Sequence, residues 1–535
     1  MVACMSRRAG TEVLDLLIDC GADVNAPVKE KRRQGGRERD TQTLPLAVCR
    51  KASLEKLKLL FRRGADIQVR SSKGYTLALL AAYEDRPELM DYLIHAGAPL
   101  DVVTSYKESA LGILSREGRF AEVHKLLAHG ADPTPLRWTA LMHAVAEGDL
   151  NKVKSLVKGG AELEATDGWK RTAFLLALHA GHREIAAYLL AQGASRDASG
   201  QSHLPAMAYP AKGNDAGMLQ WLLDQGFDLE EADHSGDTPL AIAVLAGATA
   251  CVRLLLDAGA DWQRERSEAG PLMGYASEPE IIRMLFARGA DLADLDTVAL
   301  RSFIGLGNAG TLAVSRQDYF EGRFRRFGSA NPERMEIPFW KAMVRCGWCA
   351  YWAGEQFQDD PYKRGAPAWC HDRYGMSFTS LPDGRFVQIG GEHEDSYDPD
   401  FCIYNEVFIH DGKGGFEILG YPEEVFPPTD FHSAKLLGEW IYIIGNLGYH
   451  TARGDRTPVY RLHVGTWRIE KVATAGDDPG WISRHKARVE AGRIRISGGE
   501  RLVAAEDGSQ DLAENAAEYW FDPASGVWER ISAET

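Results

Sequence analysis

Three features are scarce in this sequence. Eight cysteines are spread over 535 residues, too few for the disulfide framework of a small secreted protein. No apolar run approaches the roughly eighteen residues that span a bilayer, and no charged-plus-apolar leader is visible. Lys and Arg number 61 against 76 Asp and Glu, which gives a net charge of −15. Because nucleic-acid binding needs a concentrated basic face, we expect a cytoplasmic protein that binds neither nucleic acid nor membrane.

One sequence motif, in contrast, is abundant. An aliphatic run that closes on Gly-Ala-Asp, or a near relative, recurs nine times in the first 300 residues, at steps of 43, 33, 33, 30, 33, 33, 33 and 30 residues. Such a period is typical of repeat proteins, in which each unit packs only against its neighbours. The closing glycines are Gly21, Gly64, Gly97, Gly130, Gly160, Gly193, Gly226, Gly259 and Gly289.

Each unit predicts two short helices between polar turns. Thr172 can cap a first helix by accepting a hydrogen bond from a backbone N–H one turn in. Pro239 follows Thr238 at a first helical position, where its missing N–H costs nothing. The closing glycine suits a turn with positive φ. One helix pair cannot bury its apolar face alone, but stacked neighbours can.

These units resemble ankyrin repeats. The resemblance implies a curved α-solenoid of about nine repeats over residues 1–305 that binds other proteins. Large aromatics on protruding turns are more often used for binding than left in water. The candidate partner-binding residues on these fingertips are therefore Tyr75, Trp138, Trp169 and Arg171. The alternative is that Trp138 fills a gap, because the unit ending at Gly160 has lost its finger.

Two departures concern the first units. The excess in the 43-residue step falls at Lys29 to Asp40, which we interpret as a solvated loop, with a basic contact patch as the alternative. The first unit begins inside its first helix, without the capping turn seen elsewhere. This pattern indicates either a truncated N-terminus or a ragged first repeat.

Residues 306–370 predict a helical connecting segment. Residues 338–357 predict one amphipathic helix, with Phe339, Met343 and Ala350 on one stripe. Cys346 and Cys349, with Cys370 and His371 further on, permit a zinc hypothesis. Zinc ligand pairs usually come from tight knuckles, so we favour packing as small hydrophobic residues. We assign no metal, cofactor or catalytic residue.

From His371 onward the pattern changes to short alternating strands. Strands that end on glycine recur at residues 385–392, 440–447 and 493–500, each after a tight turn and before a hairpin. These predict three four-stranded meanders over residues 371–535.

This pattern resembles kelch repeats, which implies the blades of a β-propeller. Three blades are fewer than the roughly four to eight of closed rings, so we expect an incomplete or open propeller. The missing part could come from residues 311–370, or from a partner subunit through an open β edge, which would permit dimerisation. The third alternative is an open arc whose edge is covered by the preceding helix.

Long loops in these meanders are predicted to converge on one face, because second turns and exits lie at the same end. Residues Glu392 to Asp400 form the densest polar cluster. Its carboxylates and imidazole could bind a divalent cation or act as acid and base, or they could form local turns and pair with neighbouring arginines. The candidate partner-binding residues of this face are Glu392, His393, Asp395, Tyr397, Asp398, His432, Tyr449, His450, Arg453, Trp481 and His485. The equivalent positions of His432 and His485 favour a repeated structural role.

We therefore predict a multidomain α + β chain: an α-solenoid of ankyrin repeats, a connecting segment and an all-β kelch-like domain. Its predicted function is that of a scaffold, adaptor or inhibitor that binds one or more proteins. The alternative is a kelch-domain enzyme or a small-molecule or metal sensor that uses the Glu392–Asp400 loop, with substrate recruited by the repeats. Short regular repeats and an alanine- and arginine-rich composition suggest a bacterial source.

Overall fold

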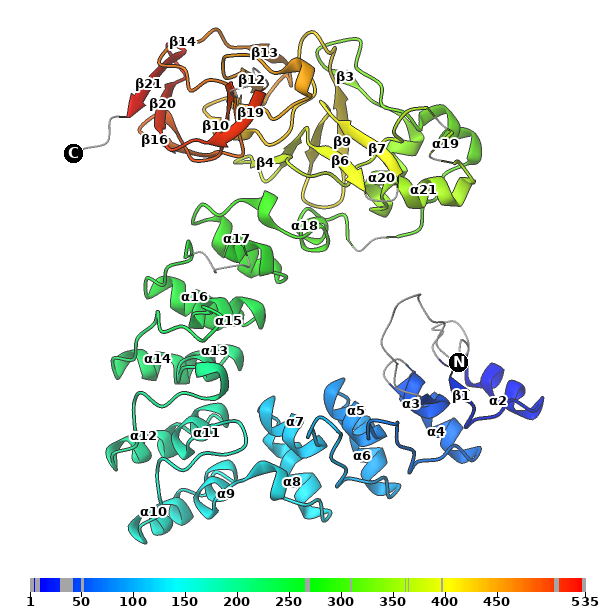
Figure 1. Ribbon diagram of the computed structural model, residues 1–535, viewed down its shortest axis with the longest axis vertical. Coiled ribbons are helices and arrows are strands. Elements are labelled where there is room, and N and C mark those ends of the chain that lie inside the picture. Colours follow the sequence, from blue (N-terminus) through cyan, green and yellow to red (C-terminus); the bar gives the residue numbers. More distant parts are fainter. Residues whose placement is uncertain are drawn as a thin grey trace. The chain divides into compact units, whose positions relative to one another are not determined.

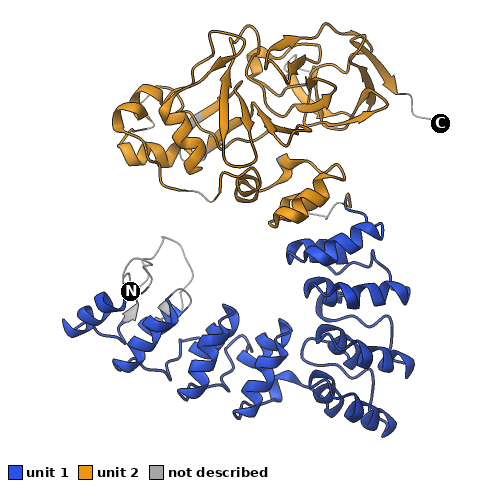
Figure 2. Ribbon diagram, turned by 180° about the vertical axis from the view of Figure 1, so that it is seen from behind, with its two compact units in different colours: residues 1–262 blue, residues 263–535 orange. Residues whose placement is uncertain are grey.

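The chain divides into two compact units, Met1–Trp262 and Gln263–Thr535, which Figure 2 colours separately. The computed structural model describes residues 4, 10–28, 42–49, 52–264, 270–307, 310–360, 362–363, 365–395, 398–504 and 510–531. The expected loop at Lys29 to Asp40 lies outside the described residues. The domain boundaries at residues 305 and 370 stay predictions.

Short helices in pairs fill the first unit (Figure 1). In five pairs the first helix follows a Thr or Ser cap. The Oγ1 of Thr172, for example, accepts a hydrogen bond from the Leu175 amide at 3.4 Å, satisfying a donor that helix geometry leaves over. Gly193 closes the same pair with a φ of 94°, where glycine has no steric penalty.

The elements of the first unit are α2 (Thr11–Asp19), β1 (Pro27–Val28), β2 (Gln42–Thr43), α3 (Leu44–Cys49), α4 (Leu54–Arg62), α5 (Leu77–Tyr83), α6 (Pro87–His95), α7 (Ala110–Arg116), α8 (Phe120–Ala128), η1 (Thr134–Leu136), α9 (Ala140–Ala146), α10 (Leu150–Lys158), α11 (Ala173–His179), α12 (Arg183–Ala191), η2 (Gln201–His203), α13 (Ala208–Lys212), α14 (Ala216–Asp224), α15 (Pro239–Leu245) and α16 (Thr249–Asp257).

The two helices of a pair bury different amounts of surface. Every residue of α11 from Ala173 to Leu178 is buried, whereas α12 buries only Ile185, Ala186 and Leu189. The reason is that α11 contacts α9 and α13 on either side, while α12 keeps a solvent-facing stripe. First helices therefore form the continuous core that stacked repeats require.

The turns before the first helices share a hydrogen-bond pattern. The Oδ1 of Asp167 accepts from the amide N–H groups of Trp169 and Arg171 at 2.8 and 2.9 Å. Such side-chain-to-backbone bonds hold a turn without help from a neighbouring strand. The same two bonds are made at other fingertips by Ser71, Thr104 and Asp233.

Helices also open the second unit. They are η3 (Leu272–Tyr275), α17 (Pro279–Phe286), η4 (Leu292–Asp294), α18 (Thr297–Phe303), α19 (Arg316–Gly322), α20 (Pro338–Cys346) and α21 (Ala350–Phe357). The prediction of one helix over residues 338–357 was wrong. Gly347 has a φ of 68° and ends α20, because a left-handed residue stops a helix and glycine adopts that conformation at least cost.

Three main sheets follow, antiparallel except for one short parallel pair in the third, and in the described residues none closes on itself. Each contains a four-stranded meander, and the predicted strands at 385–392, 440–447 and 493–500 are present as β5, β11 and β17. The first sheet holds β3 (Glu333–Arg334), β4 (Ser377–Ser380), β5 (Phe386–Ile389), β8 (Val407–His410) and β9 (Phe416–Gly420). The second holds β10 (Ser433–Leu437), β11 (Trp440–Ile444), β12 (Val459–His463) and β13 (Ile469–Lys471). The third holds β14 (Ala475–Gly476), β16 (Lys486–Glu490), β17 (Arg493–Ser497), β20 (Glu518–Asp522) and β21 (Val527–Ile531).

The polar segment from Glu392 to Phe401 is not the loop that the sequence predicts. It forms a hairpin of β6 (Glu392–Asp395) and β7 (Asp398–Ile403), with Glu392 opposite Ile403. Main-chain pairing needs no apolar alternation, so a charged segment can form strands without the pattern that reveals them. A second inserted hairpin, β18 (Glu500–Ala504) and β19 (Gln510–Glu514), lies beside β15 (Ile482–Ser483).

Apolar layers separate the sheets. The first and second sheets share a core that includes Val387, Ile409, Ile441 and Leu462. The second and third share one that includes Ile444, Ile494, Phe521 and Trp528. The connecting helices pack on the first sheet through Phe339, Trp340, Met343 and Phe408. The segment at 311–370 therefore covers one end of the series of sheets.

The far face of the third sheet is charged instead. Arg493 pairs with Glu529 at 3.0 Å, and Arg495 with Glu518 at 2.5 Å. The guanidinium of Arg493 also lies 4.6 Å from the ring centre of Trp520. Ion pairs of this kind, with exposed side chains, suit contact with water, unlike the apolar faces between the sheets.

Consecutive first strands are joined by two buried histidines. His432 lies before β10, and its Nε2 is 2.8 Å from the Oγ of Ser377 in β4. His485 lies before β16 and is 2.8 Å from the Oγ of Ser433 in β10. Burial is the main cause that lowers the pKa of His432 to about 3 and of His485 to about 4, with smaller effects from His485 on His432 and from Lys435 on His485. Both rings are therefore neutral and connect neighbouring sheets.

Candidate functional site

Three of the four fingertip candidates, Tyr75, Trp138 and Trp169, are half-buried, and Arg171 is buried. Tyr75 is half-buried and donates its hydroxyl to Glu108 at 3.1 Å. Trp138 is half-buried against the core, with its ring centre 6.2 Å from that of Phe120 and 5.2 Å from that of His143. Trp138 thus packs inward, beside the repeat that has no finger.

Trp169 and Arg171 reach across that short repeat. The indole Nε1 of Trp169 donates to the carbonyl of Gly112 in α7 at 3.2 Å. Arg171 donates to the carbonyl and the hydroxyl of Ser115 at 2.7 and 2.6 Å. The finger of one repeat therefore contacts the helix of the repeat before last, where an intervening finger would otherwise lie.

Arg171 is buried, with 2% of its side chain exposed, and is held by its own chain. Its guanidinium pairs with the fully buried carboxylate of Asp167 at 2.7 Å, and its Nη1 lies 2.8 Å from Nδ1 of His179. Burial first, and the charge of Arg171 second, lower the pKa of His179 to about 3. His179 is therefore neutral, and its Nδ1 accepts from Arg171.

A half-open cavity of about 190 Å³ lies beside this network. Its lining includes Trp169 from the fingertip, Tyr209 from α13, and three side chains that end their helices. Those three are Arg116 of α7, His179 of α11 and Lys212 of α13. Arg171 also lines the cavity. Of these lining residues, the sequence predicted only Trp169 and Arg171 as candidates. The shared position at the end of a first helix is the sequence signal that would have found the others.

The candidate residues of the second unit fall into two groups. Glu392, Arg453, Tyr449 and Trp481 are partly exposed, and His450 is exposed in η5 (His450–Ala452), whereas His393, His432 and His485 are buried. His393 donates from Nδ1 to the carbonyl of Asp372 at 2.7 Å. Asp395 and Asp398 pair through their backbones, and Tyr397 lies outside the described residues.

Asp430, which the sequence analysis did not single out, connects the exposed group. It is fully buried in the exit before His432, and its Oδ1 accepts from the Gly448 amide at 2.7 Å. Its charge acts on the carboxyl of Glu392, and the charges of Arg453 and Arg484 act on Asp430 in turn. Arg453 and Trp481 both donate to the carbonyl of Leu447, at 2.9 and 3.3 Å. The structure thus brings Glu392, Arg453 and Trp481 to one region of the second unit.

Burial and mutual repulsion favour the protonated form of Glu392. Partial burial, then the negative charge of Asp430 and its hydrogen bond, raise the pKa of Glu392 to about 7. Burial also raises the pKa of Asp430, and this effect outweighs the hydrogen bond from the Gly448 amide, which lowers it. Two adjacent carboxyl groups cannot both ionise without repulsion, so one keeps its proton near neutral pH.

We expect a pH dependence from this pair. The folded chain holds a proton on Glu392 that the unfolded chain, with an ordinary pKa of 4.5, releases. Its stabilising contribution is complete below that value and is lost as pH rises through about 7. Between about pH 5 and about pH 8, the melting temperature of the second unit should fall more in the natural chain than in Glu392→Gln. Equal slopes in scanning calorimetry would contradict the raised pKa of Glu392.

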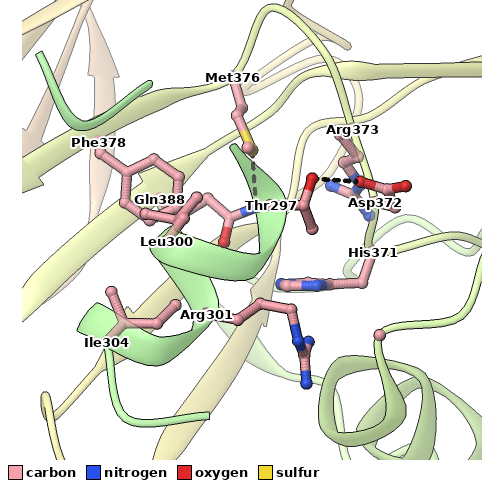
Figure 3. A pocket seen from close by; sticks show the side chains of 11 residues that line it. Thr297, Leu300, Arg301, Ile304, His371, Asp372, Arg373, Met376, Phe378 and Gln388 are labelled. Atoms are coloured by element: carbon pink, nitrogen blue, oxygen red, sulfur yellow. Dashed lines mark hydrogen bonds between the residues drawn. The ribbon is translucent and has the colours of Figure 1, made fainter. Parts of the chain in front are cut away.

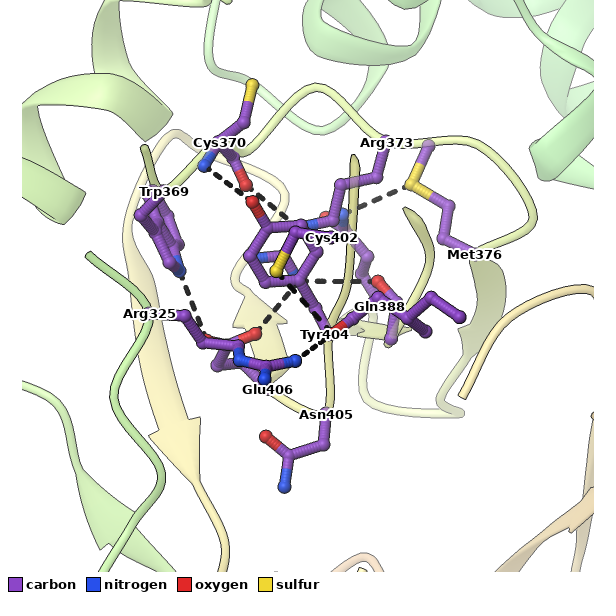
Figure 4. A network of polar contacts seen from close by, with 12 residues as sticks. Arg325, Trp369, Cys370, Arg373, Met376, Gln388, Cys402, Tyr404, Asn405 and Glu406 are labelled. Carbon is purple, nitrogen blue, oxygen red and sulfur yellow. Dashed lines mark hydrogen bonds and ion pairs between the residues drawn. The ribbon is translucent and has the colours of Figure 1, made fainter. Parts of the chain in front are cut away.

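A buried charged network lies under the first sheet (Figure 4). Arg373 pairs with Glu406 at 3.1 Å, with both side chains fully buried. Its guanidinium carbon lies 3.6 Å from the ring centre of Tyr404, and Trp369 donates to Glu406 at 3.1 Å. All these groups are enclosed, so the network supports the fold rather than contacting a partner.

The cavity in Figure 3 is small. It lies between α18 and the strands of the first sheet, with Arg301, His371 and Gln388 in its wall. Its volume is about 20 Å³, and a single water needs roughly 10–15 Å³ by the same measure. It therefore cannot hold a metabolite.

Neither unit shows a metal centre in its described part. No group of three or more His, Cys, Asp or Glu residues there is placed to hold an ion. Cys346 and Cys370 of the zinc hypothesis are buried in the core of the connecting helices. Among the described residues, no helix has the length and apolar character needed to cross a membrane.

Comparisons with known proteins identify the first unit. The family model of ankyrin repeats, in three copies, matches residues 141–214 and 206–296. Human Cyclin-dependent kinase inhibitor 2A is 33% identical over 136 residues, which cover 24% of this chain and 86% of that protein. This chain belongs to the ankyrin-repeat family. Ankyrin repeats support a role in protein interaction.

Two longer relatives match a larger part of the chain. Putative palmitoyltransferase ZDHHC13 of Danio rerio is 26% identical over 266 residues, 48% of this chain. Ankyrin repeat protein nuc-2 of Neurospora crassa is 28% identical over 249 residues, 45% of this chain. The matched regions span only 36% and 23% of the lengths of these two relatives.

Proposed function

We propose that this chain is a protein-interaction scaffold, adaptor or inhibitor that holds a partner on the fingertip side of its ankyrin repeats. The observation that carries the proposal is the half-open cavity whose wall includes Trp169, Arg116 and Lys212. Tryptophan and arginine are the residues most enriched among energetic centres of interfaces. Arg171 is left out of the proposed contact surface, because it is buried and its N–H groups already donate to Asp167 and Ser115. The proposed contact surface therefore consists of the partly exposed candidates.

The second unit is proposed to be a kelch-like open arc of three blades that presents a second binding surface. Support comes from the three meanders and from the glycine pairs after β5 and β17, all four residues having positive φ. The surface would comprise Glu392, Tyr449, His450, Arg453 and Trp481. Dimerisation through a free β edge, a cytoplasmic location and a bacterial source stay predictions.

Affinity purification with matched variants tests the proposal. The full chain is immobilised and exposed to native lysate beside Arg116→Glu/Lys212→Glu and a control, Lys158→Glu/Arg183→Glu, which makes the same charge change on α10 and α12. We expect a stoichiometric partner on the natural chain and the control, and its loss from the cavity variant. A partner that all three retain equally, or no partner at all, would contradict the proposal.

A further inference from the structure

The size of the cavity on the first unit limits what it can accept. About 190 Å³ is less than the roughly 300–1,000 Å³ of sites for free small molecules. Its mouth is half-open, and fingertip residue Trp169 forms part of its wall. These dimensions suit one protruding side chain of a larger partner.

The walls combine aromatic rings with cations. The guanidinium of Arg116 lies 5.5 Å from the ring centre of Trp169 and 6.0 Å from that of Tyr83. Lys212 approaches from α13, and the ring centre of Tyr209 is 5.1 Å from that of His179. Aromatic faces can pack the methylene groups of a ligand, while the cations bind an anionic end.

Glu117 holds the two cations in place. One of its oxygens accepts from Nε of Arg116 at 2.8 Å, and the other accepts from Nζ of Lys212 at 2.8 Å. The side chains of Arg116 and Lys212 are 37% and 48% exposed. Within the described chain, Glu117 is the sole ion-pair partner of Arg116, so the outer N–H groups of the guanidinium are available at the mouth.

The cavity is positive in a negative protein. Two positive charges, on Arg116 and Lys212, face one negative charge on Glu117. Arg171 and Asp167 neutralise one another, and His179 is uncharged. The chain as a whole carries a net charge of −15. The local positive charge attracts an anionic group at contact distance, although the net charge of the chain is negative.

We propose that this cavity binds a single aspartate or glutamate side chain of the partner protein. The carboxylate accepts hydrogen bonds from Arg116 and Lys212, and the side-chain methylenes pack on Trp169 and Tyr209. The inference deepens the proposed function, on which it rests, by naming the chemistry of the group that anchors the partner.

Selection from a random dodecapeptide phage library tests this without knowledge of the partner. The full chain is the bait, and Arg116→Gln/Lys212→Gln and Lys158→Gln/Arg183→Gln are the comparison baits. We expect enriched peptides to share Asp or Glu at one fixed position and to bind the control variant normally. Binding to the cavity variant should fall about ten- to hundredfold, as for a charged hydrogen-bonded contact. Lys212→Arg, which keeps the charge, should retain binding, and unchanged melting temperatures exclude misfolding.

Several results would overturn the inference. They are enriched peptides without a fixed acidic position, peptides that bind the cavity variant as well as the natural chain, and a failure to enrich any peptide. Exchange of the acidic residue for its amide in an enriched peptide should also weaken binding. An acidic consensus combined with no captured lysate protein would overturn the proposed function alone. Capture that persists in the absence of such a consensus would overturn this inference alone.

Discussion

Arg171→Met is expected to lower the free energy of unfolding of the first unit by about 3–5 kcal/mol. The guanidinium carries a buried pair with Asp167 and joins the finger to Ser115 across the repeat that has lost its own finger. Without it, the fully buried carboxylate of Asp167 loses its ion-pair partner. Denaturant unfolding of the full chain, followed by far-UV circular dichroism and fitted with a separate transition for each unit, measures the loss.

Two further variants separate charge from packing. Arg183→Met, on the exposed side of α12 in the same repeat, should change stability by no more than about 0.5 kcal/mol. Arg171→Met/Asp167→Asn removes both charges and keeps the Oδ1 that accepts from Trp169 and Arg171 amides. This double variant should recover a large part of the loss. If it is as unstable as the single variant, the unpaired carboxylate is not the cause.

Arg373→Met should have a comparable effect on the second unit, about 3–5 kcal/mol. It would leave the fully buried Glu406 without its ion-pair partner, while the hydrogen bond from Trp369 remains. It would also remove the guanidinium from the face of Tyr404. Trp369 is stacked on Trp340, with ring centres 4.6 Å apart, so near-UV circular dichroism should report the disturbance during unfolding.

The matched control is Arg385→Met. Arg385 is partly exposed, pairs with Asp383 in the turn before β5 and lies 5.0 Å from the ring centre of Trp467, so its loss should cost no more than about 1 kcal/mol. Glu406→Gln tests the other partner, because it keeps an acceptor for Trp369 while leaving Arg373 without its counter-charge. If Glu406→Gln or Arg373→Met matched the control, the buried pair would contribute nothing to stability.

Local signals in the sequence were sufficient for the regular parts of both units. The cap at Thr172 and the closing Gly193 act within one turn of helix, so their roles could be predicted from the residues themselves. The same holds for β5, β11 and β17, whose runs of β-forming residues end on glycine. The family resemblance to ankyrin repeats is confirmed, while the kelch resemblance stays a proposal.

Long-range contacts were not predictable in the same way. Arg171 could be placed on a fingertip, but its burial depends on Ser115, which lies 56 residues away across a shortened repeat. The β6–β7 hairpin consists of charged residues and has no apolar period. The loop that contains Asp430 has no unusual composition that would mark this residue. Only the fold places Asp430 near Glu392. The burial of Arg171, the β6–β7 pairing and the position of Asp430 each depend on contacts with other segments of the chain. No local sequence pattern specifies such contacts.

The histidine contacts between sheets follow a rule that stops at the third. Ser377 and Ser433 each begin the first strand of a sheet and receive the histidine of the next one. The first strand of the third meander, β16, begins with Lys486, which offers an ammonium group instead of a hydroxyl, and its charge acts on Asp294 of the helical segment. The serine that receives a histidine in the first two meanders is therefore absent from the third, so the repeated contact that joins one meander to the next ends there.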